Sequence, residues 1–162
     1  MRLTFTLFLA LFMNAIFGQQ LTEKYWETFK PRSVGPAGMS GRVTAIDVVA
    51  DNPEEIYIGT ASGGLWKSED GGIRWKPIFD EVEVNSVGAI AIQQNNPDVI
   101  WAGTGEGNPR NSHTSGAGIY KSIDGGVTWK LMGLEQSKTI HRIIIHRDNP
   151  DVVFVASLGS AW

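Results

Sequence analysis

The stretch Ser122-Ile123-Asp124-Gly125-Gly126-Val127-Thr128-Trp129 occurs in a second version as Ser68-Glu69-Asp70-Gly71-Gly72-Ile73-Arg74-Trp75. We call residues 68–75 the first box and residues 122–129 the second box. An aromatic residue and a lysine precede each box, Trp66-Lys67 and Tyr120-Lys121. An internal repeat of this size indicates stacked supersecondary units, because one such unit cannot bury its apolar face alone.

Asn-Pro pairs mark a third repeat. They lie at 52–53, 96–97 and 149–150, and each precedes a short apolar run: Ile56-Tyr57-Ile58, Val99-Ile100-Trp101 and Val152-Val153-Phe154. Asn52 and Asn96 are 44 positions apart, whereas Ser68 and Ser122 are 54 apart. The difference predicts a ten-residue insertion in the second repeat, within Gly105 to Gly116.

Each repeat has the pattern of four short antiparallel strands. The β-branched runs 43–48, 87–92 and 140–145 are followed by an Asn-Pro turn, a strand ending in Gly-Thr or Ala-Ser, a strand with a Lys-Ser pair, the box turn, and a strand from the box tryptophan. Repeats of about 40 to 50 residues with four strands are typical of β-propeller blades. We therefore predict an all-β propeller with four-stranded antiparallel blades, about two and a half of them present. The expected boundaries are an N-terminal segment at 19–41, blade one at 42–85, blade two at 86–138 with an inserted loop at 105–116, and the start of blade three at 139–162.

Residues 1–18 have the layout of a signal peptide. Met1-Arg2 is followed by an apolar stretch to Phe17 and then by the small residue Gly18, which is a plausible cleavage point. The stretch is short for a membrane span, so we expect export to the periplasm, the cell surface or the medium, with an N-terminal anchor as the alternative. The chain has no cysteine, which excludes disulfides and lipid attachment through an N-terminal cysteine. With 14 Lys+Arg against 17 Asp+Glu, nothing favours a nucleic acid or an anionic membrane as partner.

The boxes have the form Ser-x-Asp-x-Gly-x-Thr-Trp, which resembles the Asp-box, or bacterial neuraminidase repeat, of sialidases, sortilin-like propellers and xyloglucanase-type glycosidases. The second box fits this form fully, and the first has Arg74 where threonine is usual. Residues 35–43, 59–64 and 103–111 resemble the start of exported bacterial proteins labelled sortilin N-terminal-domain or "glycosyl hydrolase" proteins. Members of that group are much longer, so the resemblance implies an N-terminal fragment. Trp26 to Val34 resembles the segment after each box tryptophan, and we expect it to close the ring with the last blade.

The box aspartates are more readily explained as turn formers than as catalytic groups. Their carboxylates and the serine hydroxyls can accept backbone N–H bonds, glycine supplies positive φ, and tryptophan packs between blades. The residues to which we assign this structural role are Ser68, Asp70, Gly72, Trp75, Ser122, Asp124, Gly126, Thr128 and Trp129.

Blade topology places the Asn-Pro turns and the boxes on one rim, and the insertion and the connections between blades on the other. In sialidase-like propellers the second rim holds the ligand, so the resemblance implies the same here. The insertion offers polar side chains for ligand binding: Glu106, Asn108, Arg110, Asn111 and His113. The alternative is a glycine-rich loop that covers the neighbouring blade.

A glycosidase needs two carboxyl groups at a set separation. We expect Glu106, Asp80, Glu81 and Glu83 on the ligand rim, but their spacing specifies no pair. In xyloglucanase-type enzymes a catalytic aspartate follows the threonine of a Thr-Asp-x-Gly-Gly stretch, and Ala61 stands at that place in Thr60-Ala61-Ser62-Gly63-Gly64.

Two functions therefore remain open. The first is an exported binding or scaffold module for peptide or glycan within a longer protein. The second is the N-terminal part of a glycoside hydrolase whose catalytic carboxylates lie largely elsewhere. We predict no cofactor, and no metal site for His141 and His146, because their odd spacing on a strand sends them to opposite faces. Arg42 either points into the central channel or is a satisfied residue at a strand end.

Overall fold

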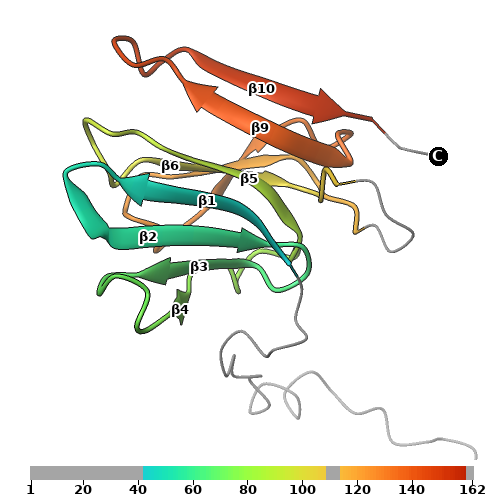
Figure 1. The fold of residues 1–162 in the computed structure, drawn as a ribbon. Helices are drawn as coiled ribbons and strands as arrows, with labels where there is room; N and C mark the ends of the chain where they lie inside the picture. The colour runs from blue at the N-terminus through green and yellow to red at the C-terminus, as the bar shows by residue number, and fades with distance from the viewer. Residues whose placement is uncertain (1–41, 109–113, 160–162) are drawn as a thin grey trace, which may run out of the picture. The chain divides into compact units, whose positions relative to one another are not determined.

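The computed structural model describes residues 42–108 and 114–159. They form ten strands in three antiparallel sheets (Figure 1). The proposed signal peptide, the ring-closing segment Trp26 to Val34, and Arg110, Asn111 and His113 lie outside the described residues. The described part of the chain contains no helix with the length and apolar composition that a membrane span requires.

Two sheets have the expected four strands in sequence order. The first sheet consists of β1 (Val43–Val49), β2 (Asn52–Thr60), β3 (Leu65–Ser68) and β4 (Lys76–Pro77), and the second of β5 (Val87–Ile92), β6 (Ile100–Thr104), β7 (Ile119–Ser122) and β8 (Lys130–Gly133). The third sheet pairs β9 (Thr139–Ile145) with β10 (Val153–Leu158). This architecture confirms the predicted all-β fold of four-stranded antiparallel blades.

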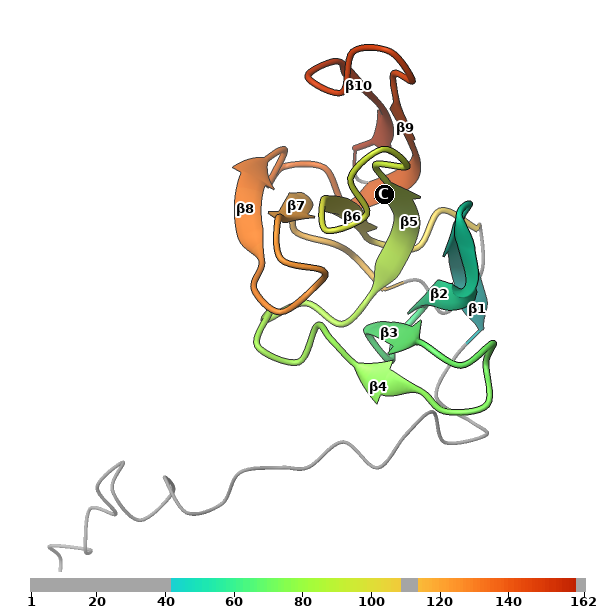
Figure 2. The ribbon, with the colours of Figure 1, turned by 90° about the vertical axis from the view of Figure 1, so that its left-hand side faces the viewer.

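The second sheet packs between the first and the third (Figure 2). One buried cluster joins Tyr57 and Leu65 of the first sheet to Val87 and Ile90 of the second. Another joins Ala89 and Ile119 of the second sheet to residues of β9. As a result β5 is buried along its whole length, which explains its unbroken run of small and β-branched residues.

Glycines at equivalent positions allow the sheets to approach closely. A Cβ on Gly59 of β2 would lie 2.6 Å from Val87 Cγ1, and one on Gly103 of β6 would lie 2.4 Å from Ile140 Cγ2. Each glycine therefore admits a β-branched side chain from the first strand of the next sheet. The Gly-Thr ends of β2 and β6 serve this sheet-to-sheet packing.

The first strand of each sheet is irregular at the same place. The pairing register skips Thr44 in β1, Gly88 in β5 and His141 in β9. Such bulges bend a strand and redirect a side chain. The three sheets thus share a bulge at the same position, although the bulged residues are of different types.

Candidate functional site

The base of the inserted loop lies on one rim, and the Asn-Pro turns and the boxes lie on the other. On one rim Gly64 N donates to Asn85 O at 2.8 Å, Gly105 N to Ser86 O at 2.9 Å, and Gly116 N to Lys138 O at 2.8 Å. We call residues 61–64, 85–86, 105–108, 114–118 and 138–139 the loop rim. The turn rim carries the Asn-Pro turns and the boxes, where Gly71 N donates to Glu54 O and Gly125 N to Asp98 O, both at 3.0 Å.

The inserted loop begins from a turn that the first sheet also has. Thr60 Oγ1 accepts from Gly63 N at 2.8 Å and donates to Gly64 O at 3.0 Å. Thr104 Oγ1 accepts from Ala117 N at 2.8 Å and donates to Gly118 O at 2.6 Å. Ala117-Gly118 therefore takes the place of Gly63-Gly64, and the extra residues leave the fold between Thr104 and Ala117. The bounds of the insertion at 105–116 stay a prediction, with which this arrangement is compatible.

Glu106 is buried in an ion pair that links two sheets. Its Oε1 contacts the guanidinium Nη2 of Arg42, at the start of β1, and its side chain is 1% exposed. Glu106 Oε2 and Arg42 Nε are buried and have no hydrogen-bond partner. Arg42 is thus held at a strand end by a carboxylate from the inserted loop. The sequence pattern did not predict this ion pair, because Arg42 and Glu106 are 64 positions apart.

The candidate ligand-binding residues of the inserted loop differ in their exposure to solvent. Asn108 is exposed on the loop rim. Its neighbour Gly107 lies against His141, since a Cβ on Gly107 would fall 2.1 Å from His141 Nδ1. The bulge in β9 therefore brings a histidine to the base of the inserted loop. Glu106 would need to leave its ion pair to reach a ligand, and its ligand role stays a prediction, as do those of Asn108, Arg110, Asn111 and His113.

The two histidines of the third sheet belong to opposite rims. His146 follows β9 at the turn rim, where Nδ1 accepts from Asp148 N at 3.2 Å and from Asn149 N at 3.1 Å. His141 lies at the loop rim instead. In residues 42–108 and 114–159 no three His, Asp or Glu side chains are grouped in a way that would hold a metal ion.

Asp80 and Glu81 do not join Glu106. They line a groove of about 650 Å³ beside the second box, together with Asp98 and Asp124. The expectation that they share the ligand rim with Glu106 is wrong, because the segment after β4 runs along the second box before it reaches β5. Trp129 Nε1 fixes this course by donating to Ile78 O at 2.6 Å.

Both boxes form the same turn. Ser68 Oγ accepts from Gly72 N at 2.8 Å, and Asp70 Oδ1 accepts from Arg74 N at 2.8 Å. In the second box Ser122 Oγ accepts from Gly126 N at 2.9 Å, and Asp124 Oδ1 accepts from Thr128 N at 2.9 Å. In both boxes the serine, the aspartate and the glycine thus take part in the hydrogen bonds of the turn.

The carboxylates of the two boxes differ in acidity. The Thr128 hydroxyl, which donates to Asp124 Oδ2 at 2.5 Å, and the Thr128 backbone N–H lower the pKa of Asp124 to about 2. Asp70 has the backbone N–H of Arg74 but no such hydroxyl, and its pKa is lowered from 3.8. Hydrogen bonds to the charged form cause both shifts.

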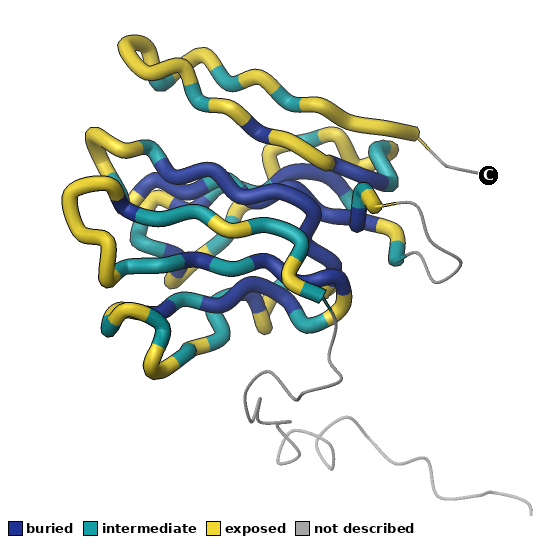
Figure 3. The backbone as a smooth tube through the Cα atoms, in the orientation of Figure 1, coloured by how far each residue is buried: buried dark blue, intermediate teal, exposed yellow. Residues whose placement is uncertain are grey.

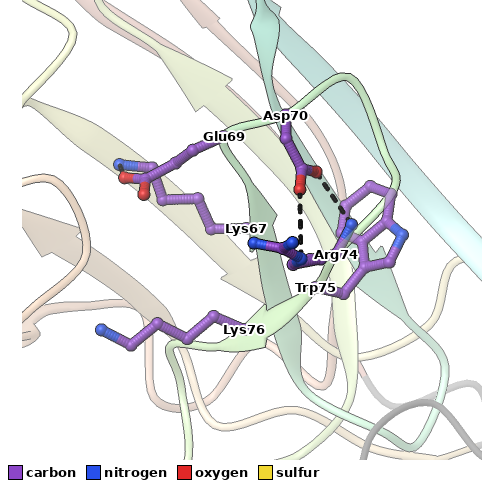
Figure 4. A pocket seen from close by; sticks show the side chains of 6 residues that line it. All are labelled: Lys67, Glu69, Asp70, Arg74, Trp75 and Lys76. Carbon is purple, nitrogen blue, oxygen red and sulfur yellow. Dashed lines mark hydrogen bonds and ion pairs between the residues drawn. The ribbon is translucent and has the colours of Figure 1, made fainter.

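A polar pocket of about 350 Å³ lies beside the first box, and Arg74 is one of its lining residues (Figure 4). Lys67, Lys76 and Trp75 are among its lining residues. Lys67 Nζ is already paired with Glu55 and Glu69, each at 2.9 Å. Burial opposes the charge of Lys67, but these hydrogen bonds outweigh it and raise its pKa. The pocket therefore holds a largely neutralised set of charges.

Comparison with known proteins agrees with the fold. No family model matches the chain. It is 31% identical over 107 residues to a Neosartorya fischeri protein described as "Probable oligoxyloglucan-reducing end-specific xyloglucanase", covering 64% of this chain and 12% of that protein. It is 32% identical over 142 residues to "Xyloglucanase Xgh74A" of Acetivibrio thermocellus, covering 74% of this chain and 16% of that protein.

A solved structure is similar as well. The GH74 enzyme of Niastella koreensis superimposes with a TM-score of 0.57 at 25% identity, covering 70% of this chain and 17% of that one. The chain spans 12% and 16% of the length of the two curated relatives. Homologues of this chain are thus xyloglucanases with β-propeller folds, and the match corresponds to a small part of each.

Proposed function

We propose that this chain supplies successive blades of a β-propeller in a longer, exported protein that binds a plant-type β-glucan such as xyloglucan. The two xyloglucanase relatives, each at least 31% identical but matched over a small part of its length, carry this proposal. They favour glycan over peptide as the ligand. The boxes serve as Asp-boxes of the bacterial neuraminidase repeat type, residues 1–18 as the export signal, and the blades divide at 42–85, 86–138 and 139–162.

The loop rim is the ligand side of this proposal. The inserted loop of the second sheet rises there from a turn fixed by Thr104, whereas the first sheet has the short turn 61–64 at the same place. A long loop on a rigid frame is a common arrangement for binding. We therefore assign the ligand contacts of this chain to the inserted loop.

The described residues favour a chain that binds the glycan and does not hydrolyse it. Ala61 follows Thr60 where the resemblance implies a catalytic aspartate, and Glu106 is neutralised by Arg42. A glycosidase needs two carboxyl groups flanking the scissile bond. The names of the relatives favour hydrolysis as the second candidate, with the catalytic pair supplied largely by other parts of the longer protein.

A comparison of two exposed asparagines tests the proposal. Xyloglucan oligosaccharides are titrated into the full chain by calorimetry, with Asn108→Ala as the variant on the loop rim and Asn95→Ala as the matched control on the turn rim. Loss of one hydrogen bond predicts roughly fivefold weaker binding for Asn108→Ala alone. Absence of binding, or equal weakening by both variants, contradicts the proposal.

A reducing-end assay on xyloglucan tests whether this chain by itself hydrolyses the glycan. We expect no hydrolysis by the chain. Release of reducing ends that Glu106→Gln abolishes, with the melting temperature preserved, would establish the enzyme instead.

A further inference from the structure

The start of the inserted loop contacts all three sheets. Gly105 N donates to Ser86 O, in the segment that leads into β5 of the second sheet, at 2.9 Å. Glu106 pairs with Arg42 at the start of β1 in the first sheet, and its backbone O accepts from Thr139 Oγ1 of β9 in the third at 3.5 Å. Ser86, Glu106 and Thr139 are all buried (Figure 3). Gly105 and Glu106, which we call the loop base, therefore join the three sheets.

Glycines bring backbone segments together around the loop base. A Cβ on Gly88, the bulged position of β5, would lie 2.2 Å from Gly105 O. One on Gly105 would lie 2.0 Å from Lys138 O, and one on Gly116 would lie 2.3 Å from Thr104 C. No side chain fits at such distances, so the backbone at both ends of the inserted loop is closely packed.

Glu106 adds a charge to this packed junction. Its side chain is 1% exposed, and a carboxylate in the interior is costly without a partner. The guanidinium group of Arg42 supplies that partner through Nη2. The buried position of Glu106 therefore depends on a residue of the first sheet that is 64 positions away.

The unpaired atoms of this ion pair are complementary. Arg42 Nε is a buried donor and Glu106 Oε2 a buried acceptor, and neither has a hydrogen-bond partner in the part of the chain that the structure describes. In a bidentate pair, two neighbouring guanidinium nitrogens face both oxygens of one carboxylate. Such a pair uses Nε and Nη2 of Arg42 and satisfies both atoms. A lysine lacks this planar fork and cannot replace arginine in full.

We propose that Glu106 is a positioning residue, which clamps the loop base to the first sheet through Arg42 and so sets the place of the inserted loop on the loop rim. It acts on the ligand through the loop, in place of the direct contact that its residue type suggests. The consequence for ligand binding rests on the proposed function. Without Arg42, the unpaired carboxylate is drawn to solvent and pulls the loop base away from the junction.

Hydrogen exchange of the full chain tests the clamp. The loop-base probes are the amides of Gly105, Glu106 and Gly116, which donate to backbone carbonyls, and the reference is the amide of Gly126 in the second box. Arg42→Ala is expected to speed exchange of the probes about tenfold and to leave the reference unchanged.

A second substitution separates an unpaired charge from a lost contact. Glu106→Gln removes the charge that Arg42→Ala leaves without a partner, so the double variant should exchange about threefold more slowly than Arg42→Ala at the loop base. Arg42→Lys keeps one charged hydrogen bond and should give an intermediate rate. Melting temperatures show which variants are folded, and if Arg42→Ala is not, Arg42→Lys takes its place in the comparison.

Arg74→Ala is the matched control. Arg74 is also paired with a carboxylate, Asp70 at 4.0 Å, but its side chain is 91% exposed and lies in the first box. Its removal should leave exchange at the loop base unchanged. An equal effect of Arg74→Ala and Arg42→Ala would contradict a specific clamp.

Titration with xyloglucan oligosaccharides connects the clamp to the ligand. Arg42→Ala should weaken binding about tenfold, and Glu106→Gln in the same chain should restore part of the affinity. Absence of glycan binding by the unaltered chain would refute the proposed function, whereas the exchange measurements need no glycan and still test the clamp.

Three results would overturn the positioning role. They are unchanged loop-base exchange in the Arg42 variant, a double variant that exchanges as fast as Arg42→Ala, and weaker glycan binding by Glu106→Gln alone with unchanged exchange. The last result would assign Glu106 to direct ligand contact.

Discussion

The first and second boxes have nearly the same sequence and the same turn. Within residues 42–108 and 114–159, the second box packs against the segment that follows β4, and no equivalent contact is seen for the first box. Trp129 Nε1 donates to Ile78 O, and its ring meets Phe79 edge-on with centroids 5.0 Å apart. Trp75 instead lines an open pocket with charged side chains. A repeated motif therefore fixes a local turn, whereas its contribution to stability depends on the neighbour that the fold provides.

The largest expected difference concerns the tryptophans. Trp129→Ala removes an inter-sheet hydrogen bond and an aromatic contact, and it should lower the free energy of unfolding by about 3 kcal/mol. Trp75→Ala should lower it by about 1 kcal/mol, because its ring is partly solvated in the pocket. Urea unfolding of the two variants measures both values. Equal losses would show that the first box has a packing partner of the same quality.

A smaller difference is expected for the box glycines. Gly126 and Gly72 have φ of +91° and +93°. A Cβ on Gly126 would lie 2.7 Å from Ile78 Cδ1, whereas one on Gly72 would lie 3.5 Å from Trp75 Cζ2. Alanine at either position pays the backbone strain of about 1 kcal/mol, and at Gly126 displacement of Ile78 should bring the total to about 2 kcal/mol.

Thermal unfolding of Gly126→Ala and Gly72→Ala provides the measurement. The Gly72 variant is the control for backbone strain alone. If the two melting temperatures fall equally, the contact of Gly126 with Ile78 has no influence on stability.

The smallest effect concerns proton binding. Asp124 titrates at about 2 when folded and Asp70 is also lowered from 3.8, so both folded pKa values lie below the unfolded ones. Their stabilisation is present above the unfolded pKa and is lost as the pH falls through the folded pKa. For Asp124 this window runs from pH 3.8 down to about 2.

Substitution of Thr128 or Arg74, each four positions after the box aspartate, tests which hydrogen bonds lower the pKa of Asp124 and Asp70. Thr128→Val should raise the pKa of Asp124, and Arg74→Thr should lower that of Asp70, because a hydroxyl bond to the carboxylate is lost or gained. Carboxyl carbon shifts in an NMR pH titration report both values. An unchanged pKa in Thr128→Val would assign the shift to backbone N–H groups instead.

Much of the fold could be predicted because its determinants are local. Asn-Pro pairs, Asp-Gly-Gly turns and β-branched runs recur at set spacings, so the strands follow from the pattern alone. The lysine before each box serine is part of that pattern as well. Its receiving ring, Tyr57 or Trp101, is identified only by the pairing of β2 with β3 and of β6 with β7.

The site was less predictable because it depends on contacts between distant segments. Glu106 has the residue type of a ligand-binding or catalytic group, yet Arg42 from another sheet neutralises it in the interior. Asp80 and Glu81 follow the course that Trp129 imposes on their segment and line the groove beside the second box. No spacing rule encodes either outcome.

Sequence alone was sufficient to define a repeating all-β chain, its turns and its extra loop, since these depend on backbone preferences and apolar period within a few residues. Tertiary structure decided which charges are paired in the interior and which tryptophan packs against a distant segment. These outcomes arise from the spacing between sheets, where Gly59 and Gly103 admit the side chains of the next sheet and distant residues come within contact of one another.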